Sequence, residues 1–192
     1  KKEQDTLYFV PTIINDHKNS SKDRLSKMLQ SKKKILFKEK FLTILDYCFV
    51  FLYPWRIAFF NIPQQEFMKF ELTPLIRSEL KSMIAYDQIC IALLNYRFAY
   101  RLKNNSVKLR LVVNWFENQI LDKGWNAGFR KFFPETLTLG YAGYMAPLNW
   151  LARYPSESEF QAQVIPEKIC VVGKEIVKRT KMFCQSLEVN VA

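Results

Sequence analysis

Histidine is nearly absent from this sequence, and His17 is the only one in 192 residues. Catalytic triads of the Ser/His or Cys/His kind need a histidine base, and His17 lies in a polar stretch, so such a triad is not expected. The four cysteines include no Cys-x-x-Cys pair, so a zinc site is not expected either. All four lie in apolar stretches, which favours buried free thiols and a reducing compartment.

Glycine is also scarce, with five residues in the whole chain. The GxxxxGK[ST] phosphate loop, the GxGxxG dinucleotide fingerprint and the GxSxG nucleophile elbow do not occur. Acidic residues are few and scattered, which gives little support to a hydrolase with paired carboxylates. The common sequence signatures of nucleotide binding and of serine hydrolases are therefore missing.

What the sequence does contain is positive charge and apolar surface: the net charge is +11 and 49% of the residues are hydrophobic. This balance favours anionic partners, such as anionic lipid headgroups, phosphorylated substrates or nucleic acid. No RNA-binding signature accompanies the charge, so nucleic acid is not expected. A basic run spans residues 18–40, where a solvated helix face is favoured over a specific binding patch.

The first part of the chain, residues 1–72, is expected to hold an edge strand, a basic loop and an apolar helix. Residues 6–14 read as the strand, and residues 15–34 as a loop or an exposed helix. Residues 37–60 are the most apolar segment and favour a buried helix followed by a turn. A membrane-surface helix is the alternative, because the cations of residues 32–40 adjoin several aromatic residues.

Residues 73–192 are expected to form a long helix followed by a parallel sheet, which makes the chain a single α/β domain. The helix begins at Thr73 and Pro74 and keeps its apolar spacing at least to Tyr96. Strands and helices then alternate in the order strand, helix, strand, loop, strand and helix, the pattern of a parallel sheet. The expected strands are 109–115, 136–139, 168–172 and 189–192, and the expected helices are 123–133 and 174–184.

Ligands of open parallel sheets bind at the carboxyl ends of the strands, and three segments lie at such ends. In the first, Glu117 is a candidate general base or hydroxyl ligand, with loop capping by Lys123 or Arg130 as the alternative. In the second and third, glycines would let the backbone approach a ligand or hold a phosphate, although a tight turn is the alternative for the second and a plain turn is favoured for the third. The candidate binding residues are Asn118, Gln119, Gly140, Tyr141, Gly143, Gly173 and Lys174.

One stretch, WFENQ at residues 115–119, continues into DKGWN at 122–126, GFR at 128–130, Pro134 and Gly140-Tyr141. This sequence motif resembles one in bacterial proteins of surface-carbohydrate biosynthesis, the glycosyltransferase-like enzymes of O-antigen or capsule assembly. Those enzymes pair two Rossmann-like domains in the GT-B architecture. The resemblance covers about a third of the chain, and the residues before 70 add nothing to it.

The resemblance implies a sugar transferase acting on a glycan or polyprenyl-phosphate acceptor at the cytoplasmic face of the inner membrane. This chain would be the acceptor-side, N-terminal domain, and a second domain would bind the nucleotide-sugar donor. Since both ends of the sequence look cut, a fragment inactive alone is expected. Glu117 would line the interdomain cleft, with Asn118 and Gln119 as orienting amides. Residues 32–55 would contact the membrane or a polyprenyl-phosphate acceptor. No bound metal or cofactor is expected.

Overall fold

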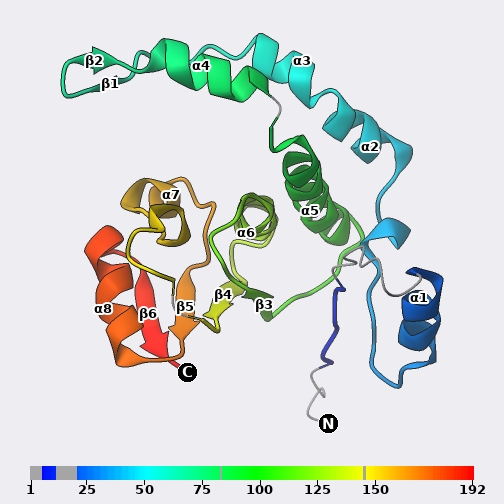
Figure 1. Cartoon of the computed structure of the whole chain (residues 1–192). Helices are drawn as coiled ribbons and strands as arrows, with labels where there is room; N and C mark the ends of the chain where they lie inside the picture. Colours follow the sequence, from blue (N-terminus) through cyan, green and yellow to red (C-terminus); the bar gives the residue numbers. More distant parts are fainter. Residues whose placement is uncertain (1–5, 12–20, 83, 145) are drawn as a thin grey trace. The chain divides into compact units, whose positions relative to one another are not determined.

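The computed structural model describes residues 6–11, 21–82, 84–144 and 146–192 (Figure 1). The chain divides into two compact units, residues 1–41 and 42–192. The first unit contains helix α1 (Ser21–Gln30), the short 3-10 helix η1 (Lys38–Lys40) and a parallel bridge between Phe9 and Ile35. The strand expected over residues 6–14 is therefore reduced to one bridge at Phe9, with residues 12–14 outside the described part of the chain.

The second unit carries the remaining elements. They form a helical and hairpin segment followed by a parallel α/β segment. The elements of the first segment are α2 (Ile44–Phe51), α3 (Tyr53–Ala58), β1 (Glu66–Phe67), β2 (Phe70–Glu71), α4 (Thr73–Ser82) and α5 (Tyr86–Asn104). Those of the second are β3 (Leu111–Trp115), α6 (Ile120–Phe132), β4 (Leu137–Ala142), η2 (Leu151–Arg153), α7 (Glu157–Gln161), β5 (Lys168–Val171), α8 (Lys174–Phe183) and β6 (Glu188–Val191).

The parallel segment is a four-stranded sheet in the order β3-β4-β5-β6, so each new strand lies beside the one before it. Helices connect successive strands, which makes this a Rossmann-like α/β fold, and the fold class expected from the sequence is confirmed. The expected strand and helix positions are also close to those found. The main difference is β4, which runs three residues further than expected, through Ala142.

The two faces of the sheet differ sharply in burial. Right-handed crossovers that all step in the same direction place their helices on the same face. On that face Val112, Ile169, Val171 and Val189 are buried, and Ile165, Ile176 and Leu187 complete the core. The opposite face carries the alternate residues of each strand, and on β3 it leaves Leu111, Val113 and Trp115 about half exposed.

Helix α6 lies unusually close to α5, because two glycines face that helix. A Cβ on Gly124 would lie 2.7 Å from the Ala92 Cα and closer still to the Ala92 carbonyl, and one on Gly128 would lie 3.0 Å from the Ala99 Cβ. The space around the contact is filled by aromatic side chains, with the rings of Phe98 and Phe129 6.5 Å apart. Glycine is thus required in α6 for helix packing.

The long helix expected from Thr73 to Tyr96 is in fact two helices: α4 ends at Ser82 and α5 begins at Tyr86. The apolar spacing continues across the break, but the packing partners change. Helix α4 contacts α3, whereas α5 packs along α6. The spacing of apolar residues indicates which side chains favour burial, but it does not indicate that α4 and α5 pack against different helices.

The expectation of a buried helix within residues 37–60 is wrong for most of the segment. Within α2 only Asp46 and Val50 are buried, and large apolar residues point outward. Those exposed by half or more are Ile44, Leu45, Phe51, Leu52, Trp55, Phe59 and Phe60. Among the described residues, no helix is both long enough and apolar enough to cross a membrane.

The inward side of α2 is held by ionic contacts to α5. The Asp46 carboxylate, which is fully buried, accepts from the Arg97 Nε at 2.6 Å and the Arg101 Nε at 2.7 Å. It also accepts from the backbone N–H of Thr43 at 2.8 Å and from its hydroxyl at 2.9 Å. Burial alone would raise the pKa of Asp46, but the Arg101, Thr43 and Arg97 hydrogen bonds outweigh it and hold that pKa far below its usual range.

Candidate active site

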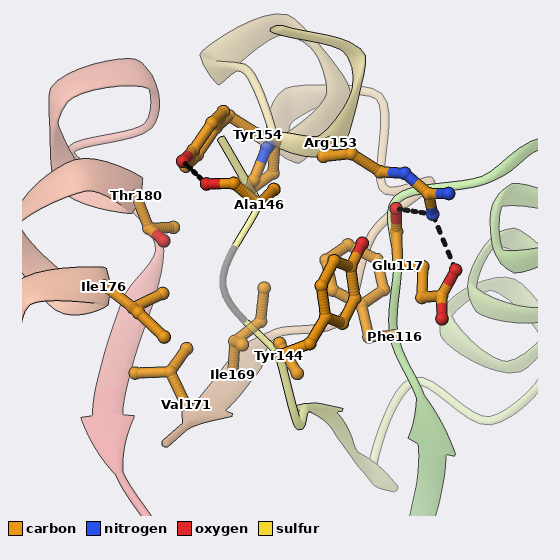
Figure 2. A pocket seen from close by; sticks show the side chains of 12 residues that line it. Phe116, Glu117, Tyr144, Ala146, Arg153, Tyr154, Ile169, Val171, Ile176 and Thr180 are labelled. Carbon is orange, nitrogen blue, oxygen red and sulfur yellow. Dashed lines mark hydrogen bonds and ion pairs between the residues drawn. The ribbon is translucent and has the colours of Figure 1, made fainter. Parts of the chain in front are cut away.

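A small cavity opens at the carboxyl ends of β3, β4 and β5, where a parallel sheet places ligands (Figure 2). Its inner wall is apolar and is built from Ile169 and Val171 of β5 and Ile176 of α8. Its outer wall holds Glu117 and Arg153, with the Tyr144 ring between them and the inner wall. The cavity measures about 40 Å³, room for a few water-sized groups and not for a whole nucleotide.

Glu117 is the acidic group of this cavity and is held in place from three directions. Its carboxylate accepts from the Trp115 indole N–H at 2.8 Å and from Arg153 at 2.6 Å, and the Gln119 amide also donates to it. The Trp115 hydrogen bond and the Arg153 charge hold the pKa of Glu117 below its ordinary value. Glu117 is therefore ionised at neutral pH, which suits a hydroxyl acceptor better than a strong general base.

Arg153 and Tyr144 complete the polar part of the cavity. Arg153 donates to both the backbone carbonyl of Glu117, at 3.1 Å, and its side chain. The Arg153 guanidinium also lies over the Tyr144 ring, 5.8 Å from its centroid. Burial raises the pKa of Tyr144, so its hydroxyl stays protonated and can donate a hydrogen bond at neutral pH.

The loop that carries Glu117 is fixed by Asp122 of α6. The buried Asp122 carboxylate accepts from the backbone N–H of Glu117 and of Gln119, each at 3.0 Å. Sequence patterns predicted that Asp122 caps this helix; it does so from inside the first turn, because α6 begins at Ile120, three residues before the expected start. Lys123 and Arg130, the partners of Glu117 in the alternative reading of this loop, instead contact Glu159 and the carbonyl of Ile165.

Asn118 and Gln119 contact the protein itself. Asn118 has a positive φ of 57° and is only 8% exposed. Its amide donates to the Ala152 carbonyl at 3.0 Å and also contacts Glu159, while its oxygen accepts from Lys123. Asn118 thus connects the β3–α6 loop to η2 and α7, and Gln119 orients Glu117.

Gly140, Tyr141 and Gly143 do not form one binding surface, because successive residues of a strand point to opposite faces of the sheet. Gly140 lies within β4 on the helix-covered face, where a Cβ would meet Pro166 at 2.8 Å and Phe116 at 2.9 Å. Tyr141 lies on the opposite face, where its ring packs edge-on against Trp115 at 5.6 Å. A Cβ on Gly143 would lie 2.8 Å from the Cζ3 atom of the same Trp115 ring and closer still to its Cη2 atom. The expected turn at these glycines is wrong, since neither has positive φ and Gly140 is strand.

Gly173 and Lys174 lie at the start of α8, after β5, as expected. Gly173 is the residue before the helix, and a Cβ there would meet nothing within 4 Å. Lys174 is exposed. The structure thus places Glu117 and Gly173 at the same edge of the sheet, while Gly140 lies inside the sheet.

Of the candidate site residues only Glu117 lines the cavity, and the polar residues that the sequence did not single out include Arg153 and Thr180. Arg153 comes from a proline-containing loop with no recognisable pattern, and only the fold brings it to Glu117, 36 positions away. Thr180 lies on the inward face of α8, where it reads as one polar position of an amphipathic helix. Among the described residues, no group of three or more His, Cys, Asp or Glu is arranged to hold a metal ion.

The fold and cavity define a Rossmann-like α/β domain with an ion-paired carboxylate at the carboxyl edge of its sheet. No family model matches the chain, and neither the curated proteins nor the solved structures show a significant similarity to it.

Proposed function

We propose that this chain is the acceptor-side domain of a glycosyltransferase-like enzyme of bacterial surface polysaccharide biosynthesis, with peripheral contact at the cytoplasmic face of the inner membrane. In this proposal the nucleotide-sugar donor binds to a second, GT-B-type domain. The acceptor is a glycan or a polyprenyl-phosphate-linked sugar. The WFENQ and DKGWN motifs within residues 115–126 support the proposal, because they resemble those of bacterial surface-carbohydrate biosynthesis proteins.

The observation that carries the proposal is Glu117, paired with Arg153 at the carboxyl edge of the sheet, beside the Tyr144 ring. Sugars are recognised by carboxylates and amides that accept from or donate to hydroxyl groups, and by aromatic faces that cover their C–H surfaces. Glu117, Arg153 and Tyr144 supply an acceptor, a donor and a ring within one small cavity. Its size suits one edge of a sugar, so the remainder of the ligand would extend outward.

Replacing Glu117 by glutamine is expected to weaken sugar binding at least tenfold, because the neutral amide accepts hydroxyl hydrogen bonds less strongly and no longer pairs with Arg153. Saturation-transfer NMR with a panel of disaccharides and UDP-glucose measures the binding. The matched control is Glu175→Gln, which removes an exposed carboxylate of α8. Unchanged binding in Glu117→Gln, or full activity of a two-domain enzyme carrying Glu117→Ala, would remove Glu117 from the site.

A second candidate is a basic membrane-binding module without catalysis, favoured by the cations of the first unit. Lys33 and Lys34 lie over the rings of Phe9 and Tyr8, at 5.1 and 5.9 Å from the ring centroids. Binding to anionic vesicles that survives Glu117→Ala, but is lost when Lys32, Lys33 and Lys34 become glutamine, would favour this module. Salt-sensitive RNA binding would favour a nucleic-acid module instead.

A further inference from the structure

The outward side of α2 and α3 is apolar, while the inward side of α2 is ionic. Within α2, the buried side carries Asp46, which faces Arg97 and Arg101 of α5. The outward side is an apolar stripe whose members are between 52% and 82% exposed. The stripe consists of Ile44, Leu45, Phe51, Leu52, Trp55 and Phe59.

This arrangement is the inverse of a helix on a water-facing surface, which turns its apolar side inward. Ile44 and Phe51 are seven residues apart, which is about two helical turns. Trp55 and Phe59 follow at steps of four residues, so the stripe stays on one side of both helices. Six large apolar side chains exposed side by side on one surface indicate contact with an apolar medium or partner.

The chemistry around the stripe favours the bilayer surface. Tryptophan and phenylalanine beside cations are characteristic of interfacial segments, and Arg56 adjoins Trp55. The β1–β2 hairpin repeats this composition, with Phe67, Met68 and Phe70 each at least 60% exposed and Lys69 between them. The hairpin leads directly into α4, which contacts α3.

The charge of the chain decides between a membrane and a second copy. At +11, two copies repel each other, whereas a surface of anionic lipid attracts each copy. We infer that the apolar stripe of α2 and α3 enters the interfacial layer of an anionic bilayer and docks the domain there. This inference deepens the membrane contact of the proposed function and does not depend on the sugar site.

Vesicle co-sedimentation tests the stripe with two matched triple variants. Phe51→Ser, Trp55→Ser and Phe59→Ser together are expected to weaken binding to phosphatidylglycerol vesicles at least tenfold. Serine at Leu148, Trp150 and Leu151 removes similarly exposed apolar groups outside the stripe, so binding should be unchanged. Circular dichroism establishes that both variants are folded, as expected for changes at exposed positions.

Cys48 provides a direct readout that needs no loss of binding. It is exposed on α2, one helical turn from Ile44 and from Phe51, whereas the other three cysteines are partly or fully buried. An environment-sensitive fluorophore on Cys48, in a background of Cys90→Ser and Cys170→Ser, should shift to the blue with anionic vesicles and not with phosphatidylcholine vesicles.

Three outcomes would overturn the inference. Vesicle binding that survives the stripe variant but is lost in Lys32, Lys33 and Lys34→Gln would leave only an electrostatic contact. A dimer that becomes a monomer in the stripe variant, without vesicle binding in either, would make the stripe a self-interface. No fluorescence shift at Cys48 would place the stripe outside the lipid. None of these outcomes bears on the sugar site, because the stripe residues do not line the cavity. The Glu117→Gln binding measurement therefore tests the proposed function separately.

Discussion

Replacing Gly124 by alanine is expected to destabilise the second unit by about 3 kcal/mol, at the upper end of overpacking effects. Alanine in an exposed helix interior would gain up to about 1 kcal/mol over glycine from helix propensity, so the clash must exceed that gain. The added methyl group would enter the backbone of Ala92, which cannot rotate away as a side chain can. Helices α5 and α6 would have to separate, which exposes the aromatic core between them.

Urea denaturation followed by circular dichroism measures this effect. Gly173→Ala is the matched control, because a methyl group there meets nothing within 4 Å and the backbone is extended. We expect that control to change stability by less than about 1 kcal/mol, the usual difference between glycine and alanine next to a helix start. A Gly124→Ala protein as stable as the Gly173→Ala protein would show that α5 and α6 are not in close contact.

Asp46→Asn is expected to cost about 3–5 kcal/mol at neutral pH, the usual range for removing one partner of a buried ion pair. The substitution leaves Arg97 and Arg101 facing each other without a carboxylate, and each of these side chains is only about one-fifth exposed. Since Asp46 joins α2 to α5, the first elements to separate should be α2 and α3. Glu175→Gln, which removes an exposed carboxylate with two weak partners, should change stability by less than about 1 kcal/mol.

The pH dependence of this difference identifies its cause. The pKa of Asp46 is depressed in the folded protein, so its ionisation stabilises the fold above the ordinary pKa of an aspartate, about 4. That stabilisation is lost as the pH falls below about 4 towards the lower, folded-state pKa. Wild type and Asp46→Asn should therefore differ most at neutral pH and converge in strong acid. A difference that stays constant with pH would mean that Asp46 acts by shape and not by charge.

The sequence predicted the sheet segment well because its strands are short apolar runs bounded by polar loops and helices. β3, β5, α8 and β6 lie within two residues of their expected ranges. The alternation also explains one error: Gly140 was read as a turn, although β4 continues through it on the covered face, where only glycine leaves room for Phe116 and Pro166.

The exposure of the α2 segment could not be predicted from its composition, because an apolar helix is more often in the core than on the surface. The informative residue was Asp46, a lone carboxylate in an apolar run, which requires a buried cationic partner wherever that side of the helix is covered. Its partners are 51 and 55 positions further along the chain. Likewise, the Glu117 loop was found as polar residues after a strand, but its partner Arg153 depended on tertiary folding.

Much of the motif at residues 115–141, on which the resemblance to carbohydrate enzymes rests, serves packing in this structure. Gly124 and Gly128 admit α5, Asn126 donates to the Asp122 carbonyl at 2.8 Å, and Asp122 fixes the loop of Glu117. Only Glu117 among the motif's polar residues lines the cavity. Most of the motif therefore forms the scaffold that holds the Glu117 carboxylate in the cavity.

The sequential order β3-β4-β5-β6 also determines how the sheet can assemble during synthesis. Among these four described strands none inserts between two earlier ones, so each can pair with the strand before it as soon as it leaves the ribosome. The loops that must close are single strand–helix–strand units, which keeps their entropic cost low. Growth in one direction leaves the free edge of the latest strand as the template for the next, and the sheet can therefore form from β3 outward without undoing any pairing already made.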